Sequence, residues 1–492
     1  MEEVKKEIFQ SDKFKSFRED IEKLKPGETL NVQGVGGSLL ALLASFIFED
    51  ALKQIVLIAS DEDLSEKLRD DCALLLGEQY VRYFGSRPMH QAQMLDMSSS
   101  ISQIETLKAL TTGEQYIVIA SPQSIVEKLP TPEKFTQTIF ELEVNHNYDF
   151  QKFIDRLDQA GFERKNFVEN YGDYAVRGGI IDVFPYVGEN PIRFEFWGDA
   201  VESIREFDVL SQRSIRELKS AGIVPNLTAD NIEETKVCTD SLLNYISKEA
   251  IIILDEPEIF KREIEELAHE NVENIFTYEE IIKKATAFPV IINSFFNEIT
   301  HNSQLSPASG QATHSTLDFN SVSQPSLNGS INLLIDHIAK LEYEGYKIFL
   351  SSDTKEETER LKELIDETVT NPERIEDRKL RSWETTHLSH LTSHIHPTFL
   401  TETVHSGFIS HASKIAVFTE HEIFGRLKRR GQIKRRRFKG FSHKELKQLK
   451  NGDYVVHVDH GIGEFAGLTK IKVGGIEQEV MKVSFLEEDT LY

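Results

Sequence analysis

Residues 171–213 read YGDYAVRGGIIDVFPYVGENPIRFEFWGDAVESIREFDVLSQR, the most informative stretch of this chain. Two runs of alternating apolar residues flank a turn cluster at Val187–Pro191, a pattern that predicts a β-hairpin. Arg193 and Trp197 are four positions apart and should share one sheet face, about 13 Å from each other at the rise of a β-strand. The returning strand brings Arg177 back towards the Trp197 end. Arginine and tryptophan on a rigid hairpin are typical of protein–protein contact sites.

The same residues also have an ordinary structural explanation. In that interpretation Arg177 pairs with Asp199, and Trp197 is half-buried in an unexceptional pair of strands. Spacing alone favours this second interpretation.

A resemblance to known families changes the balance. The runs AVRGGIIDVFP, IRFEFWGDAVESIREFD and SQRS occur in this order and resemble a segment shared by the excision-repair UvrB family and the bacterial transcription-repair coupling factor family. In those families the segment belongs to a small domain that docks onto UvrA. The resemblance implies that Arg177, Arg193 and Trp197 contact UvrA, because coupling factors place two arginines and an aromatic residue at these positions.

Length and composition limit the class of protein. A chain of 492 residues predicts three to five domains, and 39% apolar with 28% charged residues is typical of a globular protein. The longest apolar stretch, Leu39–Phe48, suits a buried helix and is too short for a bilayer. The first residues lack a signal sequence, and Cys72 and Cys238 form neither a disulfide framework nor a metal-ligand pattern. We therefore expect a cytoplasmic protein with no membrane partner.

The charge is unevenly distributed. The whole chain carries −25, yet residues 426–450 contain twelve Lys or Arg and one acid, a net +11, which leaves −36 for the remainder. Such a run is either a solvated linker or an arm that contacts nucleic-acid phosphates. The weak candidates for DNA contact in it are Arg429, Arg430, Arg435, Arg436 and Arg437.

The pattern of apolar runs predicts an α/β multidomain fold. Ile55–Ala59 and Tyr116–Ala120 are typical of buried parallel strands, each followed by a polar helix start. Hairpin patterns then predict an inserted α+β domain, after which Ala250–Leu254 resumes the first domain. A second small α/β unit follows a Ser/Asn/Gln/Pro-rich linker at 301–330. The expected domains are 1–138 and 219–320 (two parts of a UvrB-like α/β domain), 139–218 (inserted), 321–425 (small α/β), 426–448 (basic connector) and 449–492 (a partial β-barrel).

The glycine-rich turn Gly34–Ser38 lies where a UvrB-like protein keeps its phosphate loop. A working loop needs Gly-Lys-Ser/Thr at its end, and Leu39–Ala41 stands there instead, so ATP hydrolysis is not expected. The turn still precedes a helix, where weak anion binding is feasible. Asp255 and Glu256 resemble the end of a Walker B strand, although they also suit capping of the next helix. The degenerate nucleotide site would comprise Gly34, Gly37, Ser38, Asp255 and Glu256.

The C-terminal run LKNGDYVVHVDHGIGEFAGL, residues 449–468, resembles the start of the RNA-polymerase-interacting domain of coupling factors, which CarD-type regulators share. Gly461 and Gly463 permit a tight turn, and the strand Thr469–Val473 is a candidate edge for pairing with a partner strand. The resemblance implies that Ile471 contacts the polymerase β subunit; its alternative role is in the core of the barrel.

Histidines in the region before residue 412 have spacings that permit a metal site. The absence of an accompanying carboxylate or thiolate pattern favours a pH-sensitive or simply polar loop. The residues are His387, His390, His394, His396, His405 and His411.

The combined patterns imply a non-catalytic scaffold, an N-terminal portion of a coupling factor that links stalled RNA polymerase to UvrA. DNA is a further candidate partner through the basic run. No cofactor is expected in this chain, since ATP and Mg²⁺ belong to a motor of the family protein that lies outside it. One alternative is an active UvrB-like ATPase or helicase, which requires the missing loop lysine and a second motor domain. The other is a DNA-binding transcription regulator acting through residues 426–450.

Overall fold

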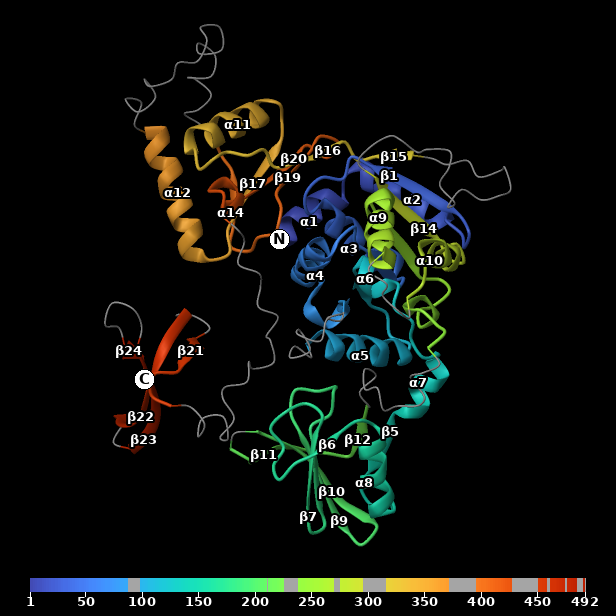
Figure 1. The fold of residues 1–492 in the computed structure, drawn as a ribbon. Coiled ribbons are helices and arrows are strands. Elements are labelled where there is room, and N and C mark those ends of the chain that lie inside the picture. The colour runs from blue at the N-terminus through green and yellow to red at the C-terminus, as the bar shows by residue number, and fades with distance from the viewer. Residues whose placement is uncertain are drawn as a thin grey trace. The chain divides into compact units, whose positions relative to one another are not determined.

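The computed structural model divides into two compact units, Met1–Gly431 and Gln432–Tyr492 (Figure 1). The structure describes residues 1–86, 98–209, 211–224, 238–269, 275–294, 316–370, 395–426, 450–457, 461–473, 476–484 and 490–491. Within these residues, no helix is both long enough and apolar enough to cross a membrane.

A seven-stranded, wholly parallel sheet is the centre of the first unit, with strand order β15-β1-β14-β13-β2-β4-β3. Its middle strands are continuous apolar runs and are buried throughout, as parallel strands covered on both faces require. The predicted strands at Ile55–Ala59, Tyr116–Ala120 and Ala250–Leu254 are confirmed. The strands are β1 Thr29–Gln33, β2 Ile55–Ile58, β3 Val81–Phe84, β4 Ile117–Ala120, β13 Ile251–Asp255, β14 Val290–Ser294 and β15 Thr316–Asp318.

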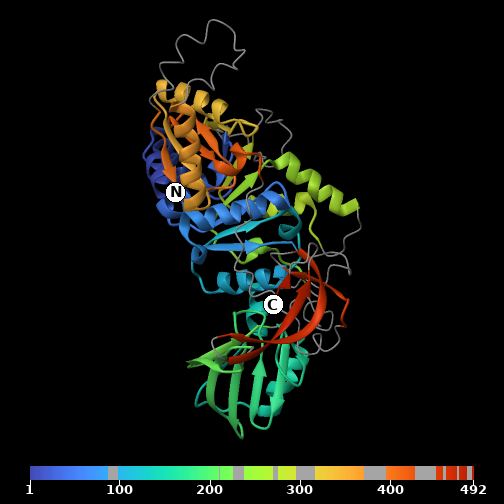
Figure 2. The ribbon, with the colours of Figure 1, turned by 90° about the vertical axis from the view of Figure 1, so that its left-hand side faces the viewer.

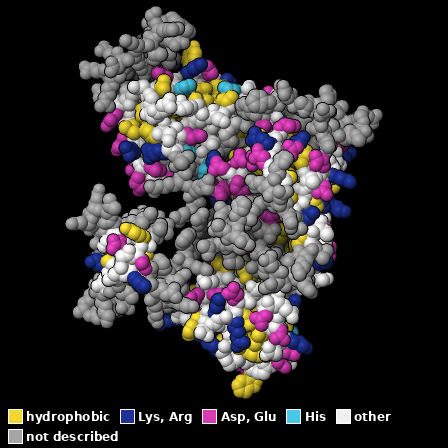
Figure 3. All heavy atoms as spheres, viewed as in Figure 1, with side chains coloured by type: hydrophobic (Ala, Val, Ile, Leu, Met, Phe, Trp, Pro, Cys, Tyr) yellow, Lys and Arg dark blue, Asp and Glu magenta, His cyan; other side chains and the backbone are white. Residues whose placement is uncertain are grey.

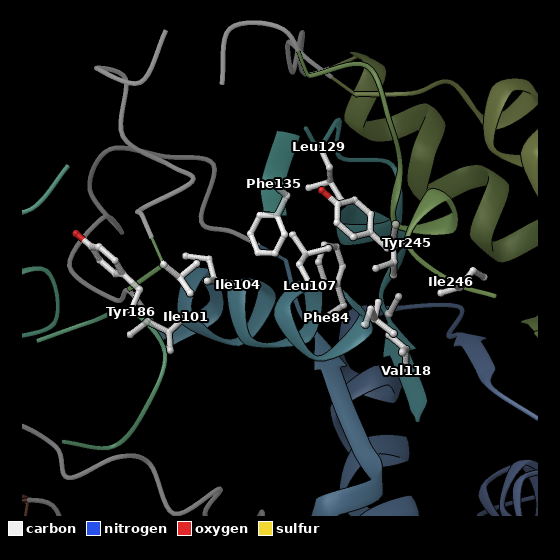
Figure 4. Close-up of a cluster of buried hydrophobic side chains, with 14 of the residues drawn as sticks. Phe84, Ile101, Ile104, Leu107, Val118, Leu129, Phe135, Tyr186, Tyr245 and Ile246 are labelled. Atoms are coloured by element: carbon white, nitrogen blue, oxygen red, sulfur yellow. The ribbon is translucent and has the colours of Figure 1, made fainter. Parts of the chain in front are cut away.

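Helices cover both faces of this sheet and create two apolar clusters. Val56 and Ile58 of β2 belong to one cluster, and Ile55 and Leu57 belong to the other, because successive strand side chains point to opposite faces. Figure 4 shows part of the first cluster along one helix. The helices are α1 Glu2–Phe9, α2 Asp12–Lys23, α3 Leu39–Ala51, α4 Glu62–Leu76, η1 Glu78–Tyr80, α5 Ser98–Thr111, α6 Pro122–Ile125, α7 Pro132–Thr138, η4 Leu242–Asn244, α9 Pro257–His269 and α10 Tyr278–Ala285.

Residues 139–223 form a second, mainly antiparallel sheet of six strands in the order β11-β10-β9-β8-β7-β6, with one helix and a separate strand pair (Figure 2). The predicted hairpin is one step of a longer meander: the turn cluster at Val187–Pro191 joins β8 to β9, and two tight turns join the strands on either side. The elements are β5 Phe140–Glu143, α8 Phe150–Gln159, β6 Glu163–Arg164, β7 Asp173–Arg177, β8 Ile180–Val183, β9 Ile192–Trp197, β10 Ala200–Phe207, β11 Ser214–Leu218 and β12 Ser220–Ile223.

A five-stranded sheet, β16-β19-β20-β17-β18, follows with its own apolar core. The described helices and strands between residues 331 and 419 form a second α/β unit, as the pattern of apolar runs predicts. The stretch 301–330 is not entirely a linker, because β15 and β16 lie in its described part, where pairing with β1 and β19 supplies the order that three-residue strands lack alone. The elements are β16 Ser321–Ser323, α11 Ile331–Tyr343, β17 Lys347–Ser351, α12 Lys355–Thr370, β18 Thr398–Leu400, β19 Phe408–Ser410, β20 Ile415–Thr419 and α14 Glu420–Ile423.

The second unit contains a four-stranded antiparallel sheet in sequential order. The prediction that Gly461 and Gly463 form a turn is wrong, because both lie in a strand, where they pair with His457 and Val455. The strands are β21 Tyr454–His457, β22 Gly461–Val473, β23 Ile476–Ser484 and β24 Thr490–Leu491.

Candidate functional site

The two faces of the six-stranded sheet differ in chemistry. Ile181, Phe194 and Phe196 point into the large apolar core, whereas the alternate positions point away from it. The register places neighbouring outward side chains in rows across the strands. These outward side chains, which we call the outer face, are Ala175, Arg177, Ile180, Asp182, Arg193, Glu195, Trp197, Ser203 and Arg205.

Two arginines on the outer face share one buried carboxylate. The Asp182 side chain is 1% exposed, and Arg193 donates to it twice, from Nε to Oδ1 at 2.7 Å and from Nη2 to Oδ2 at 3.0 Å. Arg177 Nη2 donates to the same Oδ2. The hydrogen bonds to Asp182 raise the pKa of Arg193. The hypothesis that Arg177 pairs with Asp199 is wrong, because strand register places Asp182 beside it.

The two arginines differ in how far their side chains are exposed to a binding partner. The Arg193 side chain is 18% exposed and its guanidinium carbon lies 4.6 Å from the centre of the buried Phe207 ring. The Arg177 side chain is 38% exposed, and its guanidinium carbon lies 5.3 Å from the ring centre of the exposed Phe167. Arg193 therefore stabilises the outer face through its hydrogen bonds to Asp182, whereas the guanidinium of Arg177 is partly exposed to solvent.

Trp197 stands at the same end of the sheet as Arg177, as the returning-strand argument predicts. It is 78% exposed, so the interpretation that it is half-buried is wrong. It pairs with Ala200 across the two-residue turn Gly198–Asp199, in which Gly198 has φ 62°, as in a type II′ turn. This short, glycine-dependent turn holds the indole at the rim of the sheet.

The turn between β7 and β8 needs both of its glycines. Gly178 has φ 60°, and a Cβ on Gly179 would lie 2.5 Å from the carbonyl oxygen of Phe196. The Gly179 carbonyl in turn accepts a hydrogen bond from Phe196 N–H at 2.7 Å. The turn that carries Arg177 is thereby fixed against the strand that carries Trp197.

The remaining charges of the outer face are paired. Arg205 Nη2 and Ser203 Oγ both donate to Glu195 Oε2, so this carboxylate is neutralised within the sheet. The outer face thus holds three arginines and two carboxylates, a local net positive charge in a strongly acidic chain. Figure 3 shows hydrophobic and charged side chains intermixed over the region of this sheet.

The glycine-rich turn after β1 is filled by the protein's own chain. A Cβ on Gly34 would lie 2.6 Å from Asp318 Oδ1, and one on Gly37 would lie 2.4 Å from the Gly407 carbonyl oxygen. Two backbone amides of this turn have protein partners: Gly37 N–H donates to Ser323 Oγ at 3.1 Å, and Ser38 N–H donates to the Ser406 carbonyl at 3.0 Å.

Asp71 of α4 completes this contact between the first and third sheets. The Asp71 carboxylate is buried and accepts from Ser38 Oγ at 2.5 Å and from both the backbone N–H and Nδ1 of His405, each at 2.9 Å. His405 is therefore a buried contact residue, and the prediction of a polar loop is wrong for it.

Asp255, which the sequence places at the end of a strand that resembles Walker B, is also buried. Asp255 accepts from Asn293 Nδ2 at 2.7 Å across the sheet, and burial raises its pKa. Its side chain hydrogen-bonds with Asn293 and Ser60 in place of capping α9, so the capping interpretation is wrong for Asp255. Glu256 follows at the strand end with φ 41°.

The remaining predicted residues lie away from these sites or outside the described part of the chain. Of the six histidines, His387, His390 and His394 lie outside the described residues, as do the five candidate arginines of the basic run. His411 contacts Tyr346, and His396 is exposed. Among the residues that the structure describes, no three His, Cys, Asp or Glu side chains group as a metal site. The backbone of Ile471 pairs with Gln478 in the β22–β23 ladder.

Two segments of the chain match models of known protein families. Residues 140–228 match the family model described as the UvrB interaction domain, and residues 449–492 match the CarD-like/TRCF RID domain. The transcription-repair-coupling factor of Bacillus subtilis (strain 168) is 23% identical over 565 residues, covering 100% of this chain and 46% of that protein. Those of Staphylococcus aureus strains bovine RF122 / ET3-1 and MRSA252 are 23% and 22% identical over 94% of this chain and 44% of their own length.

The chain is similar in sequence to the transcription-repair-coupling factors. It spans less than half the length of these relatives. The outer face lies wholly within residues 140–228, the segment that matches the UvrB interaction domain.

Sequence reasoning missed three features of these sites. Asp182 is the hub of the outer face, and its signal was an acid in the otherwise apolar run GGIIDVF, opposite an arginine strand. Phe167 had no signal, because its relation to Arg177 depends on how the preceding loop folds. The contact between Asp71 and His405 joins residues 334 positions apart, and no local pattern encodes it.

Proposed function

We propose that this chain is the docking portion of a transcription-repair-coupling factor, which recruits UvrA through the outer face of its six-stranded sheet. The observation that carries the proposal is the pairing of an accessible cation, Arg177, with an accessible indole, Trp197, on a rigid face of the segment that matches a UvrB interaction domain. Exposed tryptophan and arginine on fixed backbone are the side chains that dominate binding energy at protein interfaces. Arg193 serves the same contact chiefly by holding Asp182.

We further propose that the nucleotide site of the UvrB-like α/β domain is degenerate and does not bind or hydrolyse nucleotide. The support is that Gly37 and Ser38 use their amides within the chain. In addition, burial raises the pKa of Asp255, which favours the neutral acid over an ionised magnesium ligand. We expect neither ATP nor Mg²⁺ to bind at Gly34, Gly37, Ser38, Asp255 or Glu256.

For the second partner we propose RNA polymerase, through residues 449–492. The support is the RID-domain match and the pairing of β22. β21 pairs with its first residues, Gly461–Glu464, and β23 with Leu468–Val473; in the described part of this sheet no strand pairs with the other edge of Leu468–Val473. That edge is suited to accept a strand of the polymerase β subunit, with Ile471 as the specific contact. The four strands would form part of a small barrel.

These assignments imply a division of labour along the chain. We propose a UvrB-like α/β domain in two parts (1–138 and 219–320), an inserted UvrA-docking domain (139–218), a small α/β domain (321–425), a basic connector (426–448) and part of the polymerase-interacting domain (449–492).

The experiment is a quantitative binding assay of the purified 492-residue chain with UvrA, with and without ATP and Mg²⁺. We expect Trp197→Ala to weaken binding by about 30-fold, equivalent to ~2 kcal/mol, and Arg177→Gln to weaken it by a similar factor. Tyr343→Ala is the matched control, because Tyr343 is 76% exposed on α11, in another sheet's layer. Undiminished binding by the Trp197→Ala, Arg177→Gln double variant would refute the docking assignment.

Nucleotide gives a second, independent readout. ATP–Mg²⁺ should change neither the affinity for UvrA nor the melting temperature of the chain, because ligand binding to the folded state would raise that temperature. A saturable rise in melting temperature with ATP would refute the degenerate-site proposal and leave the docking proposal standing.

A further inference from the structure

A loop crosses the outer face and presents an aromatic ring beside Arg177. It comprises residues 165–172, between β6 and β7, and Phe167 at its tip is 57% exposed. Single exposed apolar side chains are common and need no explanation by themselves. Phe167 differs from these because its backbone is fixed from both sides and its ring is paired with an arginine of the proposed docking site.

Hydrogen bonds fix the loop at both ends. At its start, Lys165 N–H donates to the Tyr174 carbonyl at 2.8 Å. At its end, the buried Asp173 carboxylate accepts from the N–H groups of Glu169 and Asn170 at 3.1 and 2.7 Å. An acceptor of this kind over two successive amides leaves the loop little conformational freedom.

An apolar anchor orients the tip of the loop. Val168 is 1% exposed and packs with Ala175, Phe184 and Phe207 in a small core of its own on the outer face. Because Val168 points into this core, its neighbour Phe167 is held outward. Phe207 also lies over the Arg193 guanidinium, so one core supports both the loop and the second arginine.

The position of the Phe167 ring gives it a specific relation to Arg177. Its centre lies 5.3 Å from the guanidinium carbon, within the range of a cation–π interaction. The ring restricts where Arg177 can reach, and both groups remain accessible. A carboxylate of a partner that pairs with Arg177 would bring an adjacent apolar surface onto Phe167.

We infer that Phe167 is a contact residue of the docking site, and that it adds an apolar subsite next to the charge of Arg177. This inference rests on the proposed function, with UvrA as the occupant. Trp197 and Phe167 then provide two apolar contacts on the outer face, each beside a glycine turn or a hydrogen-bonded loop that limits its motion. Preorganised aromatic side chains of this kind lose little entropy on binding.

Site-specific photocrosslinking tests the inference directly. The photoreactive residue p-benzoylphenylalanine is placed in the full chain at position 167, at position 197, or at position 343 as the control, and each protein is irradiated with UvrA. We expect crosslinks from positions 167 and 197 and none from position 343. Crosslinking from 197 without crosslinking from 167 would overturn the role of Phe167 while leaving the docking function intact.

Affinity provides the second measurement. Phe167→Ala should weaken UvrA binding by roughly fivefold to tenfold, as for a moderate interface contact, and Phe167→Tyr should keep most of the affinity. The melting temperature of Phe167→Ala should match that of the unaltered chain, because the ring is mostly exposed. An unchanged affinity would overturn the inference, and a chain that does not bind UvrA at all would overturn both this inference and the proposed function.

Discussion

At the scale of single residues, the proposed function depends on which charged side chains are buried and which are exposed to a partner. Asp182 has two cationic partners and almost no contact with solvent, so it organises the outer face without being available to a partner. Arg177 and Trp197 are the accessible groups. A variant at Asp182 therefore reports on the architecture of the site, and variants at the other two report on binding.

We expect Asp182→Ala to loosen the six-stranded sheet. Removal of one partner from a buried ion pair costs about 3–5 kcal/mol, and we discount this to ~2–3 kcal/mol because both arginines reach solvent. Hydrogen exchange of amides in residues 173–207 should accelerate accordingly. Glu206→Ala is the control, since the Arg216 partner of Glu206 is largely exposed; equal acceleration in both variants would contradict the hub role of Asp182.

Asp255 gives a pH-dependent prediction. Burial raises its pKa, so the folded state favours the protonated acid; this contribution to stability is present below the ordinary Asp pKa of about 3.9 and is lost as pH rises through the raised folded value. Asp255→Asn avoids that loss, and its Oδ1 can still accept from Asn293. The advantage of the variant in urea midpoint over the unaltered chain should grow from about pH 4 to about pH 7. Asp12→Asn should show no such gain, because its hydrogen bond with Lys15 lowers the pKa of Asp12.

At the scale of elements, helix ends and tight turns show where the chain accepts strain. The helix α3 ends at Leu52, which adopts a left-handed conformation (φ 50°, ψ 39°) although it is not glycine and is 69% exposed. By contrast, the turns that carry Arg177 and Trp197 have glycine at their left-handed positions. The left-handed backbone is therefore unstrained in the turns of the proposed docking site, where glycine adopts it, and strained at the end of α3, where leucine adopts it.

Leu52→Gly should stabilise the protein. Glycine adopts the left-handed conformation without the clash of a Cβ, which is worth about 1 kcal/mol before the entropic cost of a more flexible unfolded chain. The net gain should be about 0.5 kcal/mol, measured as a rise in the urea midpoint. Leu52→Ala, which removes the same side chain and keeps the Cβ, should give no gain; a gain of equal size would mean that the exposed side chain, not the backbone, is responsible.

At the scale of the whole molecule, the glycine-rich turn Gly34–Ser38 joins two sheets of the first unit. Ser38, Asp71 and His405 form a buried hydrogen-bond network, and Gly37 fits against the Gly407 carbonyl with no room for a side chain. The glycines of this turn permit a close approach of backbone to backbone.

Asp71→Ala should uncouple these two sheets. It leaves Ser38 Oγ and two His405 N–H groups without their acceptor, and each buried unsatisfied group costs about 1–3 kcal/mol. Hydrogen exchange should increase in residues 34–42 and 403–410 together, and remain unchanged in residues 173–207. Acceleration confined to one of the first two segments would show that the network does not couple them.

Much of the fold follows from local patterns. The runs of Ile, Val and Leu in β2, β4 and β13 predict buried parallel strands because they are short and rich in β-branched residues, whereas the longer apolar run of α3 forms a buried helix. Short strands such as β15 and β16 escaped prediction, since their order comes from pairing partners far away in sequence. The turn expected at Gly461 and Gly463 was wrong because glycine is permitted in a turn but does not require one.

The sequence by itself determined the long buried strands, the positions of Arg177, Arg193 and Trp197 on one face, and the absence of lysine from Leu39–Ala41, because these depend on residue type and on the two-residue period of a strand. Only the tertiary structure decided that Asp182 holds both arginines, that Phe167 stands over one of them, and that residues 318–323 and 403–407 fill the glycine-rich turn. The physical reason is that ion pairs, ring contacts and backbone packing depend on distance in space, which residues separated along the chain acquire only when the strands and loops pack together.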